Sequence, residues 1–97
     1  MSNRVTQDDT DTVLNRLMIF LCSNHRINAR NGLSTVFEIE QIRTDGFTAF
    51  DSNYFKDILM AISNQTNEIH VNGERVQLTN RGIDNCRDYV ENLEYDF

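Results

Sequence analysis

Apolar side chains recur at helical spacing near the start of the chain. They lie three and four residues apart and cover nearly the whole circumference by residue 22, which predicts a helix over residues 11–25 with Thr10 or Asp11 as its N-cap. Its apolar residues are Val13, Leu14, Leu17, Met18, Ile19, Phe20, Leu21 and Cys22. Residues 1–9 are polar and are expected to be a frayed segment, and residues 24–35, rich in Asn, are expected to form a loop.

The pattern of residues 34–46 fits two kinds of element. A helix would begin at Ser34 or Thr35 and end at Gly46, where glycine can take the left-handed conformation of a C-cap. Its inward residues would be Val36, Phe37 and Ile42, with Ile39 as a further candidate. The alternation of apolar and acidic residues over 37–40 has period two and fits the start of a short strand equally well.

A further helix is predicted over residues 52–64, where Asp51 supplies the N-cap side chain. Its apolar positions follow the 3.6-residue period and are Tyr54, Phe55, Ile58, Leu59 and Ile62. The polar run over residues 63–67 is expected to end it.

Alternating residues on either side of Asn72-Gly73 give the clearest local signal in the chain. Asn-Gly suits the two positive-φ positions of a type I′ turn, so residues 68–78 are expected to form a β-hairpin. Its inward face would consist of Ile69, Val71, Val76 and Leu78. Thr79 then caps a last helix over residues 80–93, whose inward residues are Ile83, Cys86, Val90 and Leu93, with Tyr89 and Phe97 broadening the stripe.

Length and composition indicate one globular domain, residues 10–97. The hydrophobic fraction of 39% is ordinary for a folded protein, which argues against disorder. The longest apolar run, residues 17–22, is far shorter than the roughly 20 residues that span a bilayer. A cytoplasmic protein is expected, and Cys22 and Cys86 are therefore expected to be reduced, buried thiols.

The formal net charge is −6, which disfavours simple affinity for nucleic acid. The acidity lies at the two ends, because one arginine faces three acids over residues 1–12 and one arginine faces five acids over residues 82–97. The segment between them is neutral, so a locally basic face remains open.

The order of predicted elements, with Leu78-Thr79, two polar residues and Gly82 leading into the last helix, resembles the small winged-helix regulators of bacteria and archaea. The resemblance implies a mostly α fold with a C-terminal hairpin, in the order α-α-α-β-β-α. It places residues 52–64 as a DNA recognition helix and Asn72-Gly73 as the tip of the wing. The candidate nucleic-acid-binding residues that the resemblance implies are Asn53, Lys56, Asn64, Arg75, Arg81, Arg26 and Arg30.

The resemblance therefore implies a non-enzymatic, DNA-binding transcriptional regulator. Residues 51–81 hold three basic against four acidic side chains, which departs from a typical DNA binder. The alternative is an acidic winged-helix module for protein contact, such as an adaptor or an inhibitor of a nucleic-acid-binding partner. The wide apolar stripes of the first and last helices favour a homodimer in either case. Its interface would use Phe20, Cys86, Tyr89, Leu93 and Phe97.

Other chemistry is disfavoured. Cys22, His25, His70 and Cys86 are zinc-ligand types, but His70 alternates with residues expected to face the core and so points away from the others. A Cys22–His25 nucleophile pair lacks an orienting third group. A solvated face explains the acidic residues Glu38, Glu40 and Asp45. Pairing with the dipole of the first helix explains Asp8, Asp9 and Asp11. No catalytic residue, metal or cofactor is expected.

Overall fold

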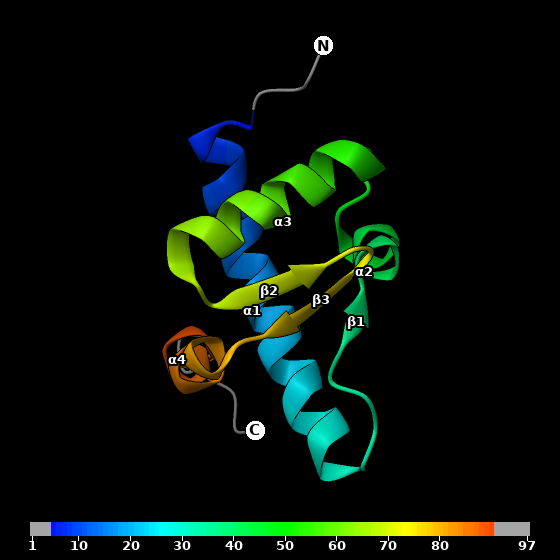
Figure 1. The fold of residues 1–97 in the computed structure, drawn as a ribbon, viewed down its shortest axis with the longest axis vertical. Coiled ribbons are helices and arrows are strands. Elements are labelled where there is room, and N and C mark those ends of the chain that lie inside the picture. The colour runs from blue at the N-terminus through cyan, green and yellow to red at the C-terminus, as the bar shows by residue number, and fades with distance from the viewer. Residues whose placement is uncertain (1–4, 91–97) are drawn as a thin grey trace.

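The computed structural model describes residues 5–90, which form four helices and three short strands (Figure 1). The helices are α1 (Gln7–Arg30), α2 (Ile39–Gly46), α3 (Ser52–Thr66) and α4 (Asn80–Val90), and the strands are β1 (Phe37–Glu38), β2 (Ile69–Asn72) and β3 (Arg75–Leu78). The strands form one antiparallel sheet in the order β1-β3-β2. The fold is thus mostly helical, with a small sheet to which the predicted hairpin contributes two strands.

The long helix α1 forms the spine of the molecule, and the other elements are arranged along it (Figure 1). It begins at Gln7, because Thr6 is the N-cap and its Oγ1 accepts a hydrogen bond from the Asp9 amide at 3.1 Å. It also continues to Arg30, through residues that were predicted to form a loop. The side-chain amide of Asn24 donates to the Phe20 carbonyl at 2.8 Å, so this asparagine is satisfied within the helix and does not end it.

The segment after α1 takes the strand alternative before it becomes helical. Phe37 pairs with Val76 in β1, and the Ile39 amide then donates to the Glu74 carbonyl at 2.9 Å as α2 begins. Val36 is exposed, so its predicted inward position is wrong. The left-handed C-cap predicted at Gly46 is also absent, because Gly46 is the last helical residue and Phe47 follows it with φ −137°.

The N-cap of α3 is confirmed, since Asp51 Oδ1 accepts from the Tyr54 amide at 2.7 Å. The helix ends at Thr66, where Asn67 adopts the left-handed conformation with φ +57°. The hairpin is confirmed as well, but Asn72 pairs with Arg75, so the two turn residues are Gly73 and Glu74. Gly73 has φ +62° and Glu74 does not have a positive φ, which fits a type II′ turn. The predicted type I′ turn is wrong, since it requires a positive φ at Asn72, which Asn72 does not have.

The core lies between α1, α3 and the inner face of the sheet. Every element except β1 and α4 contributes buried residues to it, and Phe47 joins them from the α2–α3 connection. The core residues are Val13, Leu17, Met18, Leu21, Cys22, Ile39, Ile42, Phe47, Phe55, Ile58, Leu59, Ile62, Ile69, Val76 and Leu78. None of the helices between residues 5 and 90 is both long enough and apolar enough to cross a membrane.

Helix α4 packs beside α1 below the hairpin (Figure 1). Its predicted cap is confirmed, because Thr79 Oγ1 accepts from the Gly82 amide at 3.1 Å. Ile83 is 38% exposed, so its predicted place on the inward stripe is wrong. The expectation of free thiols is wrong too, since Cys22 of α1 and Cys86 of α4 form a disulfide with their Cα atoms 5.5 Å apart.

Candidate functional site

The outer face of α3 is polar and uncovered. Phe55, Ile58, Leu59 and Ile62 turn inward with no exposed surface, so the 3.6-residue period places the remaining side chains on the opposite face. The exposed residues of that face are Asn53, Asp57, Met60 and Asn64, with Lys56 beside them at its edge. The three recognition-helix residues predicted from the sequence therefore lie on one face.

The hairpin tip is tied to this face by an ion pair. Lys56 Nζ donates to Glu74 Oε2 at 2.7 Å, and Glu74 is the second residue of the turn. The Lys56 side chain is 32% exposed and that of Glu74 is 75% exposed, so water screens the pair and its net contribution to stability is small. The pair joins helix and turn into one surface, which we call the α3–hairpin surface (residues 52–64 and 72–75).

The connection from α2 into α3 is fixed by a second polar cluster. The Arg43 guanidinium donates to the Glu40 carboxylate and, at 3.0 Å, to the Phe50 carbonyl. Ser52 Oγ donates to Glu40 Oε1 at 2.8 Å. The hydrogen bonds from Arg43 and then from Ser52 hold the pKa of the exposed Glu40 carboxyl below its ordinary value. The cluster thereby sets where α3 begins relative to α2.

The α3–hairpin surface is close to electrically neutral. Its charged side chains are two basic and two acidic residues, namely Lys56, Arg75, Asp57 and Glu74. The acidic first turn of α1 also lies against α3, because the Tyr54 hydroxyl donates to Asp9 and the Gln7 side chain contacts that of Gln65 at 3.3 Å. This surface can place polar side chains against a partner but carries little attraction for phosphate.

The four arginines predicted to contact DNA do not gather on one face. Arg75 is exposed on β3, and Arg81 is exposed in the first turn of α4. Arg26 and Arg30 lie in the last turns of α1, about 25 Å or more along the helix axis from its first turn, which is the turn that contacts α3. Only Arg75 belongs to the α3–hairpin surface.

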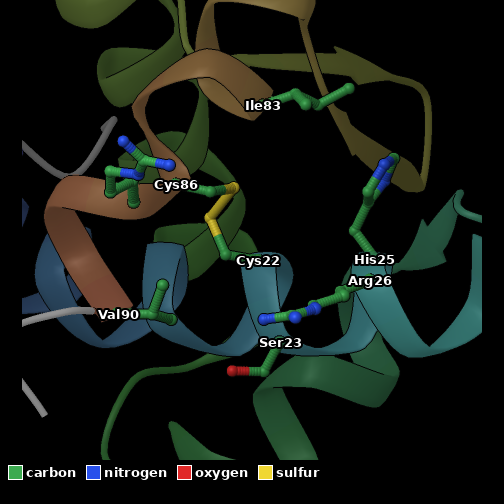
Figure 2. Close-up of a pocket in the computed structure, with 8 residues that line it drawn as sticks. Cys22, Ser23, His25, Arg26, Ile83, Cys86 and Val90 are labelled. Carbon is green, nitrogen blue, oxygen red and sulfur yellow. A yellow bond between two sulfur atoms is a disulfide. The ribbon is translucent and has the colours of Figure 1, made fainter. Parts of the chain in front are cut away.

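A second feature is a groove between α1 and α4, hereafter the α1–α4 groove (Figure 2). It has a volume of about 310 Å³ and is lined by Cys22, Ser23, His25, Arg26, Ile83, Cys86, Arg87 and Val90. The disulfide, Ile83 and Val90 make its apolar part, and its basic residues are His25 and Arg26 of α1 and Arg87 of α4. None of these eight residues is acidic.

Comparison of the chain with protein-family models, with curated proteins and with solved structures found no match. The function is therefore inferred from the residues of the α3–hairpin surface and of the α1–α4 groove.

The sequence identified Cys22 and His25 as residues with possible chemistry, but it did not predict the α1–α4 groove that they line. Cys22, His25 and Arg26 share one face of α1 at spacings of three and four residues, a signal that was visible. Cys86 is the only other cysteine of the chain, but the sequence does not show that it lies against this face of α1. The disulfide occupies both sulfurs that the zinc alternative needs, and His70 is exposed on the outer face of the sheet. The described residues contain no group of three or more side chains placed to hold a metal ion.

The residues predicted to form a dimer interface have contacts within the chain. The Phe20 ring packs edge-on against Phe37 at 6.2 Å between centroids, Cys86 is bound to Cys22, and the Tyr89 hydroxyl donates to Glu68. Leu93 and Phe97 lie outside the described residues. The homodimer stays a prediction.

Proposed function

We propose that the chain is a non-enzymatic winged-helix protein that binds duplex DNA through the α3–hairpin surface and acts in transcriptional control. The observation that carries the proposal is the Lys56–Glu74 pair, which joins the polar face of α3 to the tip of the hairpin. A helix and an adjoining β-turn presented together are the two parts that a winged helix lays on DNA. This function implies a cytoplasmic location.

The order of elements and the sheet order β1-β3-β2 support the winged-helix assignment. In this arrangement α3 takes the recognition position, and Asn53 and Asn64 are its candidates for hydrogen bonds to base edges. Met60 lies exposed between them and offers an apolar contact of the kind that thymine methyl groups accept.

The Lys56–Glu74 pair also explains how a near-neutral surface can bind phosphate. Glu74 is mostly exposed, so a DNA phosphate can replace it as the partner of Lys56 without desolvating a buried group. Binding then exchanges one weak, screened ion pair for a contact that releases a counterion from DNA.

The experiment is a salt titration of binding to a random-sequence 25-base-pair duplex, followed by fluorescence anisotropy. Wild-type affinity is expected to fall steeply with salt. Glu74→Gln frees Lys56 and is expected to raise affinity at low salt by roughly fivefold, because binding no longer breaks the Lys56–Glu74 pair. Lys56→Gln is expected to weaken binding.

Asp84→Asn is the matched control, because it also removes one negative charge but from an exposed position on α4. An equal gain in affinity from Asp84→Asn would show that total charge, and not the α3–hairpin surface, governs binding. Absence of binding by the wild type at the lowest salt would contradict the proposal.

A protein-contact function is the second candidate, and Met60 favours it. This flexible apolar side chain is 49% exposed in the middle of a neutral polar face, a composition that suits a protein partner. If DNA binding is absent, Met60→Glu is the variant that should abolish the partner contact, whereas Glu74→Gln should leave it largely intact.

A further inference from the structure

The Cys22–Cys86 disulfide lies in the wall of the α1–α4 groove and not at the centre of the core. Cys22 is 4% exposed, Cys86 is half-buried, and both line the 310 Å³ groove. Figure 2 shows the two sulfurs meeting between α1 and α4, with Ile83 and Val90 on either side along α4. The bridge therefore borders the groove on its Cys86 side.

Basic residues of α1 line the same groove as the bridge. His25 and Arg26 follow Cys22 by three and four residues and so share its face of the helix. Figure 2 shows the Arg26 side chain extending back along α1 toward the turn that carries Cys22. The Nδ1 atom of His25 is buried and, among the described residues, has no hydrogen-bond partner. A guanidinium such as that of Arg26 favours the thiolate form of a nearby cysteine, which is the form that leaves and attacks in disulfide exchange.

Helix α4 has several contacts with the rest of the chain besides the bridge. The buried Glu68 carboxylate accepts hydrogen bonds from Asn85 Nδ2 and from the Tyr89 hydroxyl, each at 2.7 Å. The Thr79 amide donates to the Glu68 carbonyl at 3.0 Å, and Thr79 caps the helix. None of these contacts involves a sulfur atom, so we expect α4 to stay beside the sheet when the bridge is reduced.

We propose that Cys22 and Cys86 form a reversible thiol–disulfide site, which an anionic low-molecular-weight thiol reaches through the α1–α4 groove. The occupant is anionic because the described lining residues include Arg26 and no acidic residue. Its short aliphatic part lies against Ile83 and Val90.

The exchange proceeds in two balanced steps. The small thiolate attacks Sγ of Cys86, the more exposed of the two cysteines, and the electron pair of the broken S–S bond passes to Cys22 Sγ, which leaves as a thiolate. A second small thiolate attacks the sulfur of the bound small molecule in the mixed disulfide and releases Cys86 as a thiolate. Two small thiols are oxidised to one small disulfide while the protein disulfide gains two electrons, and a small disulfide drives the reverse reaction.

The experiment exposes the oxidised, folded protein to glutathione and separately to neutral 2-mercaptoethanol, and counts released thiols by the mass added on alkylation. Reduction is expected to be first order in each thiol and to proceed without denaturant. Mixtures of reduced and oxidised glutathione are expected to give a reproducible intermediate fraction of bridged protein from either starting state.

Arg26→Gln tests the role of the groove. It is expected to lower the ratio of the glutathione rate to the 2-mercaptoethanol rate by about threefold or more, because the attraction for an anion is lost. Arg30→Gln is the matched control, since Arg30 is exposed one turn further along α1 and does not line the groove. It is expected to leave that ratio unchanged.

Four outcomes overturn the proposal. Reduction only in urea would show that small thiols cannot reach the bridge in the folded protein. Thiols that stay free in excess oxidised glutathione would show that the pair does not close. An equal effect of Arg26→Gln and Arg30→Gln would remove the groove from the recognition. A rate that falls as protein concentration rises would show that a second copy of the chain covers the groove. Because no readout uses DNA, these results are independent of the DNA-binding proposal.

Discussion

Gly82 is the residue at which the last helix comes closest to the sheet. A Cβ atom built there would lie 2.0 Å from the carbonyl oxygen of Glu68 and 3.1 Å from a methyl group of Leu78. The same Glu68 carbonyl accepts the Thr79 amide, so the close approach is part of how the hairpin joins α4. The Leu-Thr-polar-polar-Gly run therefore has a steric cause in this chain.

Gly82→Ala is expected to destabilise the protein by about 2 kcal/mol or more, even though alanine is the better helix former by about 1 kcal/mol. The clash is with backbone, which cannot turn aside as a flexible side chain can. Gly46→Ala is the control, because Gly46 also lies in a helix but has nothing within 4 Å of the added Cβ. It is expected to be neutral or stabilising. Urea unfolding of both variants measures the difference, and equal stabilities would contradict the steric account.

Tyr89 is the second residue whose surroundings have a measurable effect. Burial, then the hydrogen bond to Glu68 and the negative charges of Glu68 and Asp88, raise the pKa of the Tyr89 phenol well above its ordinary value. The folded protein therefore favours the neutral phenol. The hydrogen bond also satisfies a carboxylate that is only 5% exposed.

Stability is expected to fall as pH rises above about 10, the ordinary pKa of a tyrosine. Above that pH the unfolded chain loses the Tyr89 proton while the folded chain keeps it, so the unfolded state is favoured increasingly until the folded pKa is reached. At pH 8, Tyr89→Phe is expected to cost about 1–2 kcal/mol through the lost hydrogen bond. It should also show a shallower decline between pH 9 and 11.

Urea unfolding at a series of pH values measures both effects. Tyr54→Phe is the control, because it removes a phenol that hydrogen bonds to Asp9 but keeps Tyr89. It should retain the alkaline decline of the wild type. A Tyr89→Phe variant with an unchanged alkaline slope would show that Tyr89 is not its source.

At the scale of elements, the position of the hairpin turn decides which residue must adopt a positive φ, and a one-residue difference in register changes that residue. Gly73 carries the positive φ at the first turn position, whereas Asn72 is the last residue of β2. Gly73→Ala is therefore expected to cost about 1 kcal/mol or more, and Asn72→Ala only a few tenths. Urea unfolding of the two single variants distinguishes the turns, since a type I′ turn would make both substitutions costly.

Elements with a local chemical marker were predictable from the sequence, and those set by distant contacts were not. Asp51 and Thr79 marked the starts of α3 and α4 because a cap is a bond between near neighbours. The end of α1 was missed because Asn24 bonds within the helix. Strand β1 depends on pairing with β3, whose residues lie far along the chain, so its two residues left strand and helix equally open.

The same limit applies to the candidate site. The polar face of α3 followed from the 3.6-residue period, so Asn53, Lys56 and Asn64 were placed together correctly. The Lys56–Glu74 pair spans 18 residues and depends on how the hairpin folds back over α3. The α1–α4 groove depends on the packing of helices from opposite ends of the chain, which no local pattern specifies.

At the scale of the whole molecule, the Cys22–Cys86 bridge joins residues 64 apart and so closes most of the described chain into one loop. Closing a loop of this length restricts the unfolded chain far more than the folded one, and chain-entropy arguments give about 4 kcal/mol. The hydrogen bonds of α4 to Glu68 and the buried packing of the core do not require the S–S bond. Reduction is therefore expected to lower stability without abolishing the fold.

Urea unfolding with and without excess reductant measures this loss, which is expected to be about 4 kcal/mol. The double variant Cys22→Ala, Cys86→Ala supplies the control: its stability should not respond to reductant, and it should lie near or slightly below that of the reduced wild type. A small further loss follows from removing the buried Cys22 side chain from the core. Far-ultraviolet circular dichroism at zero urea should be nearly the same in all three proteins. Loss of helical signal on reduction would mean that α4 is held mainly by the bridge, and that its hydrogen bonds to Glu68 form only when the bridge is closed.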